Sequence, residues 1–68
     1  MPKPETATER LGAFEALAAE VRAELAADEA RMAELRSQGK VKTATYRQLF
    51  ASRSMLRDIC RRLDEHGL

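Results

Sequence analysis

Apolar residues recur along the first half of the chain at alternating steps of three and four positions. This spacing places them on one face of an α-helix, in the heptad pattern through which helices pack side by side. The series comprises Leu11, Phe14, Ala18, Val21, Leu25, Met32 and Leu35, with one polar member, Asp28. Thr6 and Glu9 have the spacing of a capping box, so the pattern predicts a helix over about residues 7–38, after a disordered segment at residues 1–5.

The heptad pattern weakens at residues 39–43, where we expect a turn. Gly39 can take the left-handed backbone conformation that commonly ends a helix. Thr43 or Thr45 can then cap a second helix. The sequence therefore predicts that the chain reverses direction here.

A second helix is predicted over about residues 44–66. Its apolar seam contains Tyr46, Leu49, Leu56, Cys60 and Leu63, with Phe50, Met55 and Ile59 beside it. Gly67 and Leu68 follow with the residue types of a Schellman ending. We predict an all-α, two-helix antiparallel hairpin that forms a single domain over residues 6–68. Since the heptad frame also runs through Gly39, two long straight helices paired antiparallel are the alternative.

The second seam is interrupted by a basic residue, Arg53. A turn centred on residues 40 and 41 places residues at equal distances from it opposite each other, so Arg53 should face Asp28. An aspartate can accept two hydrogen bonds from a guanidinium, which makes a charge in an apolar seam tolerable. We interpret the pair as a buried structural polar layer that fixes the register of the helices.

The apolar surface of the second helix is wider than one neighbouring helix can cover. A 68-residue chain also has too small a core to be more than marginally stable alone. We therefore expect a homodimer that forms a four-helix bundle, or binding to the helix of a partner protein. The predicted interface consists of Phe50, Met55, Leu56, Ile59 and Leu63.

The composition offers few residues for chemistry. One cysteine, Cys60, and one histidine, His66, cannot form an internal disulfide or complete a zinc site. No sequence motif indicates a nucleophile, a phosphate loop or a cofactor site, so we expect no catalysis, metal or cofactor. With no signal-peptide pattern and no membrane span in the sequence, a cytoplasmic protein is expected.

The charge is unevenly distributed: residues 1–38 have a net charge of −3 and residues 39–68 of +4. Packing of an acidic helix on a basic one accounts for this. A nucleic-acid surface is the alternative, because basic residues beside an aromatic side chain bind phosphates and stack bases. The residues in question are Lys40, Lys42, Arg47, Arg57 and Arg61, near Phe50.

The overall plan resembles that of the Rop family, plasmid proteins that dimerise as short helical hairpins and bind paired RNA loops. The likeness covers chain length, heptad periodicity and turn position, without a shared residue motif. It implies a dimeric bundle and RNA as a ligand. From the residues, however, we expect a non-catalytic protein interaction or adaptor module, with a small RNA- or DNA-binding regulator as the alternative, since the overall charge is only +1.

Overall fold

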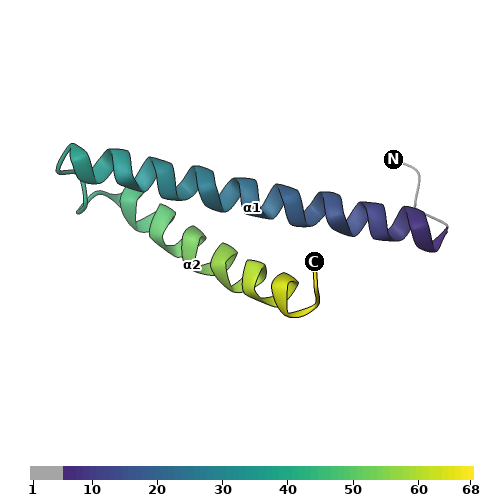
Figure 1. Cartoon of the computed structure of the whole chain (residues 1–68). Coiled ribbons are helices and arrows are strands. Elements are labelled where there is room, and N and C mark those ends of the chain that lie inside the picture. Colours follow the sequence, from purple (N-terminus) through teal and green to yellow (C-terminus); the bar gives the residue numbers. More distant parts are fainter. Residues whose placement is uncertain (1–5) are drawn as a thin grey trace.

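The computed structural model describes residues 6–68, which form two α-helices joined by a short turn (Figure 1). Helix α1 spans Ala7–Ser37 and helix α2 spans Ala44–Glu65. The helices pack against each other, and none of the described residues lies in a strand. The predicted all-α hairpin is therefore confirmed. The segment predicted to be disordered, residues 1–5, lies outside the described residues.

Both helices begin at the expected type of cap. The Thr6 hydroxyl oxygen accepts a hydrogen bond from the backbone N–H of Glu9 at 3.1 Å. At the start of α2, the Thr43 hydroxyl accepts one from the backbone N–H of Tyr46 at 3.2 Å. Each bond satisfies one of the backbone donors that a helix leaves free in its first turn.

Both helices also end in the same way, with a glycine in the left-handed region. Gly39 has φ 70° and Gly67 has φ 77°. The next residue in each case donates its N–H back into the last turn: Lys40 to the Leu35 carbonyl at 2.8 Å and Leu68 to the Leu63 carbonyl at 2.9 Å. This is the Schellman arrangement. The alternative of one straight helix running through Gly39 is not adopted.

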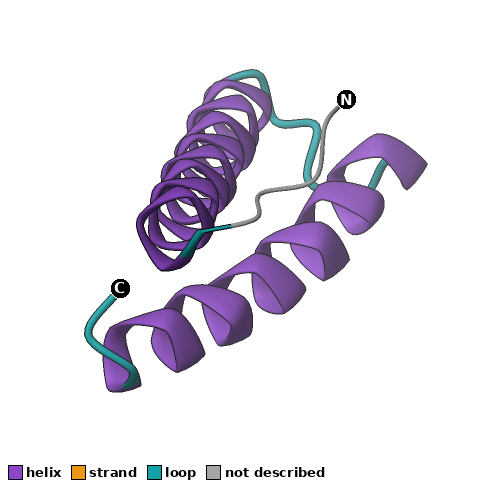
Figure 2. Ribbon diagram, turned by 90° about the vertical axis from the view of Figure 1, so that its right-hand side faces the viewer, coloured by secondary structure: helices purple, strands orange, loops and turns teal. Residues whose placement is uncertain are grey.

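The core lies in the narrow contact between the two helices. It consists of Ala18, Val21, Met32, Leu35 and Leu56. Met32 is the most completely enclosed, with 0% of its surface exposed. Figures 1 and 2 show that α2 crosses α1 at an angle, so the helices do not run side by side along their full length. The apolar seams are consequently covered only in part.

The helices also differ in length, with 31 residues in α1 and 22 in α2. At 1.5 Å per residue, α1 is longer by about 14 Å. Its N-terminal part therefore projects beyond the end of α2 (Figure 1). We call residues 7–17 the overhang, because burial in α1 begins only at Ala18. Over the described residues, no helix combines the length and apolar character required to cross a membrane.

Candidate interaction surface

The polar layer predicted in mid-hairpin has a different composition from the one expected. The carboxylate of Asp28 accepts a hydrogen bond from the hydroxyl of Ser52 at 2.6 Å, in a partly buried position. Asp28 and Arg53 form no ion pair in the described part of the chain. Because α2 crosses α1 at an angle, the residue opposite Asp28 is displaced by one position. A short neutral hydroxyl then satisfies the carboxylate without the burial of a second charge.

Arg53 has another neighbour within its own helix. Its guanidinium carbon lies 4.9 Å from the centre of the Phe50 ring, within the range of a cation–π contact. Its Nε atom is buried and has no hydrogen-bond partner in the structure. The side chain as a whole is only half-buried, and Phe50 is 51% exposed. Arg53 and Phe50 thus form an amphipathic pair at the border between the core and the surface.

The five residues predicted as a partner interface do not share one environment. Phe50 and Met55 are exposed, and Ile59 and Leu63 are half-buried. Leu56 is only 3% exposed, because it lies at the centre of the α2 face that packs on α1. Its assignment to the partner interface is corrected accordingly: Leu56 belongs to the core of the hairpin.

The overhang carries apolar side chains whose exposure the heptad pattern alone did not indicate. Leu11, Phe14 and Leu17 remain between 48% and 51% exposed. They continue the seam that buries Ala18 and Val21 against α2. Phe14 lies beside the C-terminal end of α2, which leaves about half of its surface exposed. The signal was present in the predicted helix bounds, since a helix of about 32 residues extends beyond one of about 23.

An apolar depression lies between the overhang and the C-terminal end of α2. It has a volume of about 380 Å³, and it is lined by Phe14, Ile59, Arg62, Leu63, His66 and Leu68. A second, smaller hollow of about 280 Å³ lies further along the overhang, between Ala7, Arg10, Leu11 and Phe14. Phe14 borders both hollows, so this side chain is at the centre of the uncovered apolar surface.

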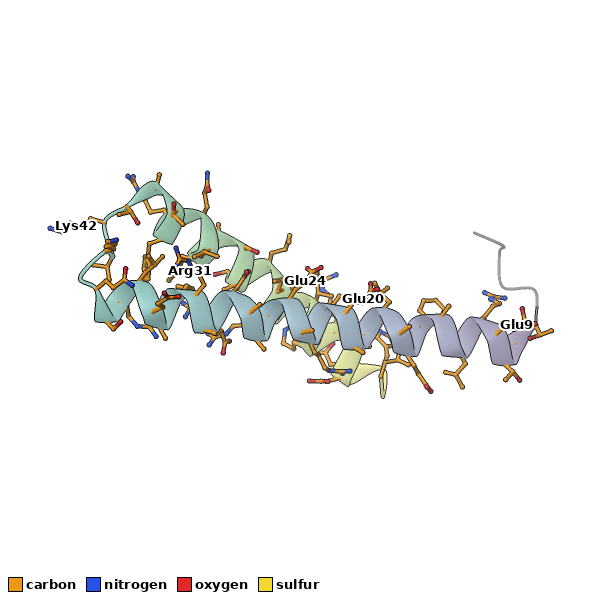
Figure 3. All side chains as sticks on the ribbon, turned by 90° about the horizontal axis from the view of Figure 1, so that it is seen from above. Glu9, Glu20, Glu24, Arg31 and Lys42 are labelled. Atoms are coloured by element: carbon orange, nitrogen blue, oxygen red, sulfur yellow. The ribbon has the colours of Figure 1, made fainter. Side chains whose placement is uncertain are left out.

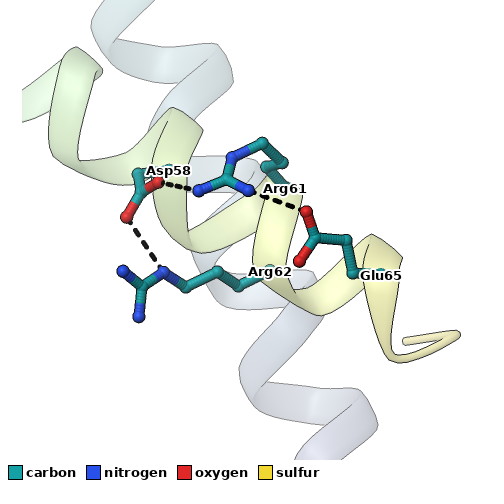
Figure 4. Close-up of polar contacts among 4 residues, drawn as sticks. All are labelled: Asp58, Arg61, Arg62 and Glu65. Carbon is teal, nitrogen blue, oxygen red and sulfur yellow. Dashed lines mark hydrogen bonds and ion pairs between the residues drawn. The ribbon is translucent and has the colours of Figure 1, made fainter.

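The basic residues proposed for nucleic acid do not form one free cationic surface. The Nε of Arg57 lies 3.3 Å from a carboxylate oxygen of Glu29. Arg61 bonds both Asp58 and Glu65, as shown in Figure 4. The hydrogen bond from Arg61 is the main reason why the pKa of Asp58 lies below its ordinary value. Two of the five predicted residues are therefore already paired with carboxylates.

The remaining three basic residues, Lys40, Lys42 and Arg47, are exposed at the turn end of the hairpin. None of them forms an ion pair within residues 6–68. Three exposed carboxylates of α1 also lack such a partner there: Glu15, Glu20 and Glu24. Figure 3 shows Glu20 and Glu24 along the middle of α1, and Lys42 at the turn. The uncompensated charges of opposite sign are thus separated along the hairpin.

Residues with other candidate chemistry lie apart from one another. Cys60 is half-buried, and His66 is exposed at the end of α2. The hydroxyl of Tyr46 accepts a hydrogen bond from Arg36 at 3.3 Å. Across residues 6–68, there is no group of three or more side chains suited to hold a metal ion.

Comparison of the chain with protein-family models, with curated proteins and with solved structures finds no match.

Proposed function

We propose that this protein is a small, non-catalytic interaction module that self-associates, with two antiparallel hairpins forming a four-helix bundle. One observation carries the proposal: the apolar stripe of Leu11, Phe14 and Leu17 continues the buried face of α1 towards its N-terminus, where about half of each side chain stays exposed. Exposed apolar stripes of this kind are typical of helices that pack against a partner.

The size of the exposed surface supports the same conclusion. The chain has an accessible surface of 5339 Å². A compact monomer of 7.6 kDa exposes only about 4,300 Å². The excess of roughly 1,000 Å² is comparable to the 800 Å² that each partner buries in a standard protein interface.

The shape of the hairpin agrees with this comparison. Its radius of gyration is 15.4 Å, whereas a compact domain of this length has about 11 Å. A second hairpin alongside the first covers apolar surface that one hairpin leaves in water. Cytoplasmic location is part of the proposal, because the single thiol, Cys60, has no disulfide partner in the chain.

The proposal is tested by sedimentation equilibrium of the full chain over a range of concentrations, with reductant present to prevent intermolecular oxidation of Cys60. A dimer has twice the monomer mass of 7.6 kDa. A monomer at every concentration refutes self-association. The exposed stripe then becomes a surface for a helix of another protein, which is the adaptor form of this function.

A nucleic-acid-binding regulator is the second candidate. It is favoured by the exposure of Lys40, Lys42 and Arg47 without ion pairs among the described residues. Binding through these residues must weaken steeply as salt rises, because it releases counterions from the phosphates. A titration of labelled RNA and DNA hairpins that shows no binding even at low salt eliminates this candidate.

A further inference from the structure

The two ends of the hairpin differ in a way that makes them complementary. The overhang presents Leu11, Phe14 and Leu17, with Glu15 among them and Glu20 after them. Neither carboxylate has an ion-pair partner within residues 6–68. Towards the turn, the exposed apolar residues are Val41 and Phe50. The cations without ion pairs in the described part of the chain, Lys40, Lys42 and Arg47, lie at this same end. Each end therefore offers an apolar surface next to charged side chains. The charges are negative at the overhang and positive at the turn.

The positions of these residues along the axis of α1 agree with two copies of the chain packed antiparallel. Arg22 is the midpoint of α1. Glu15 lies seven residues to its N-terminal side, or about 10 Å along the axis. Asp28 lies about 9 Å to the C-terminal side of Arg22. The hydrogen bond between Asp28 and Ser52 shows that Ser52, and with it the neighbouring Arg53, lies at about this height along α1. In two full-length antiparallel copies aligned at this midpoint, Glu15 of one copy therefore lies within about 3 Å of the level of Arg53 of the other.

The apolar residues follow the same correspondence. Phe14 lies about 12 Å from the midpoint of α1 on the N-terminal side. Phe50 precedes Ser52 by two residues, which places it about 3 Å further from the midpoint than the level of Asp28. Phe14 of one copy is thus level with Phe50 of the other, and the two half-exposed rings can pack together.

From these correspondences we infer the identity of the surface that covers the overhang: the Phe50–Arg53 side of α2 in a second, antiparallel copy of this chain. Glu15 of one copy then supplies a carboxylate beside the guanidinium of Arg53, whose Nε atom has no partner in the single hairpin. Two-fold symmetry repeats the contact at both ends of the dimer. This inference rests on the proposed self-association and specifies its geometry.

The competing arrangement pairs the two overhangs with each other, end to end. It covers the same apolar stripe, but it brings Glu15 close to its own symmetry mate. Like charges that face each other across an interface disfavour association. It also leaves Phe50 exposed and the cations at the turn without compensation.

A charge-exchange experiment separates the two arrangements. Dimer dissociation constants are measured by sedimentation for the native chain, for Glu15→Arg, for Arg53→Glu and for an equimolar mixture of the two variants. Each variant alone places like charges at both contacts, which should raise the dissociation constant about tenfold or more. In the mixed dimer, both contacts join opposite charges again, so affinity returns to within about threefold of the native value.

The matched control is Glu15→Arg mixed with Arg62→Glu. Arg62 follows Arg53 by nine residues and lies on the opposite side of α2, where it is paired only with Asp58. Arg62→Glu copies keep Glu15 and Arg53, so they should pair with themselves at native affinity. The mixed dimer with Glu15→Arg retains one contact between like charges and should stay weaker than the native dimer. A second readout does not depend on Arg53: in a Cys60→Ser background, Phe14→Cys and Phe50→Cys copies are mixed and oxidised. The inferred dimer gives cross-links between the two variants, in excess of cross-links of Phe14→Cys with itself.

The outcomes distinguish this inference from the proposed function. If the native chain is a monomer, both are wrong. If it is a dimer in which the charge exchange fails to restore affinity and Phe14→Cys cross-links mainly with itself, the antiparallel docking is wrong and self-association stands. Restored affinity together with cross-links between the two variants supports both.

Discussion

The replacement Phe14→Ala tests the idea that the overhang is an interface. Phe14 is 49% exposed in the single hairpin. A phenylalanine presents about 200 Å² for burial, so a partner covers roughly 100 Å² more of it. At 25 cal/mol per Å², and allowing for the area that alanine still buries, the loss is about 2 kcal/mol in each copy. Both copies of a dimer lose this contact, so dimerisation weakens by about 4 kcal/mol, or roughly a thousandfold in the dissociation constant.

The assay is sedimentation over a concentration series, combined with far-ultraviolet circular dichroism to check that the variant remains helical. Ala19→Ser is the matched control, because Ala19 is exposed and lies about 140° around α1 from Phe14. The control should have the native dissociation constant. If a helical Phe14→Ala variant changes the dissociation constant by less than about threefold, well under 1 kcal/mol, the overhang is not an interface.

Three further predictions concern the hairpin itself. Met32→Ala removes the most completely buried side chain and should cost about 2–5 kcal/mol in urea denaturation, a large part of the stability of so small a domain. In a double-mutant cycle, Asp28→Ala and Ser52→Ala should show a coupling energy of about 1.5–3 kcal/mol, and additivity within about 0.3 kcal/mol contradicts the observed bond. The hydrogen bond from Arg61 lowers the pKa of Asp58 in the folded state. The carboxylate therefore contributes fully to folding stability above the pKa of an unfolded aspartate, about 3.9, and this contribution is lost as the pH falls through the lower pKa of the folded state. Asp58→Asn should therefore flatten the decline of melting temperature as the pH falls below about 5, and an unchanged decline would count against the Asp58–Arg61 contact.

The boundaries of the two helices could be predicted from the sequence because they depend on interactions within a few residues. Thr6 and Thr43 cap the helices through bonds to backbone groups three residues away. Gly39 and Gly67 end them because only glycine takes a left-handed conformation at little cost. A helix N-cap or a Schellman ending requires no distant partner, so local sequence carries all the information.

The contacts between the helices were decided by the tertiary structure. The prediction that Asp28 meets Arg53 assumed helices that run side by side, but α2 crosses α1 at an angle and brings Ser52 to the carboxylate instead. A change of one position in register is invisible to heptad spacing, because the periodicity stays the same when one helix moves or tilts relative to the other.

The difference between local sequence and tertiary packing also explains which apolar residues are buried. Heptad spacing alone shows which of them share a face: Phe14, Val21 and Met32 belong to one stripe of α1. That Met32 is enclosed while Phe14 remains half-exposed depends on how the two helices pack. Helical periodicity is a property of one helix, whereas burial requires a second surface at the same level. The end of α2 borders Phe14 on one side only.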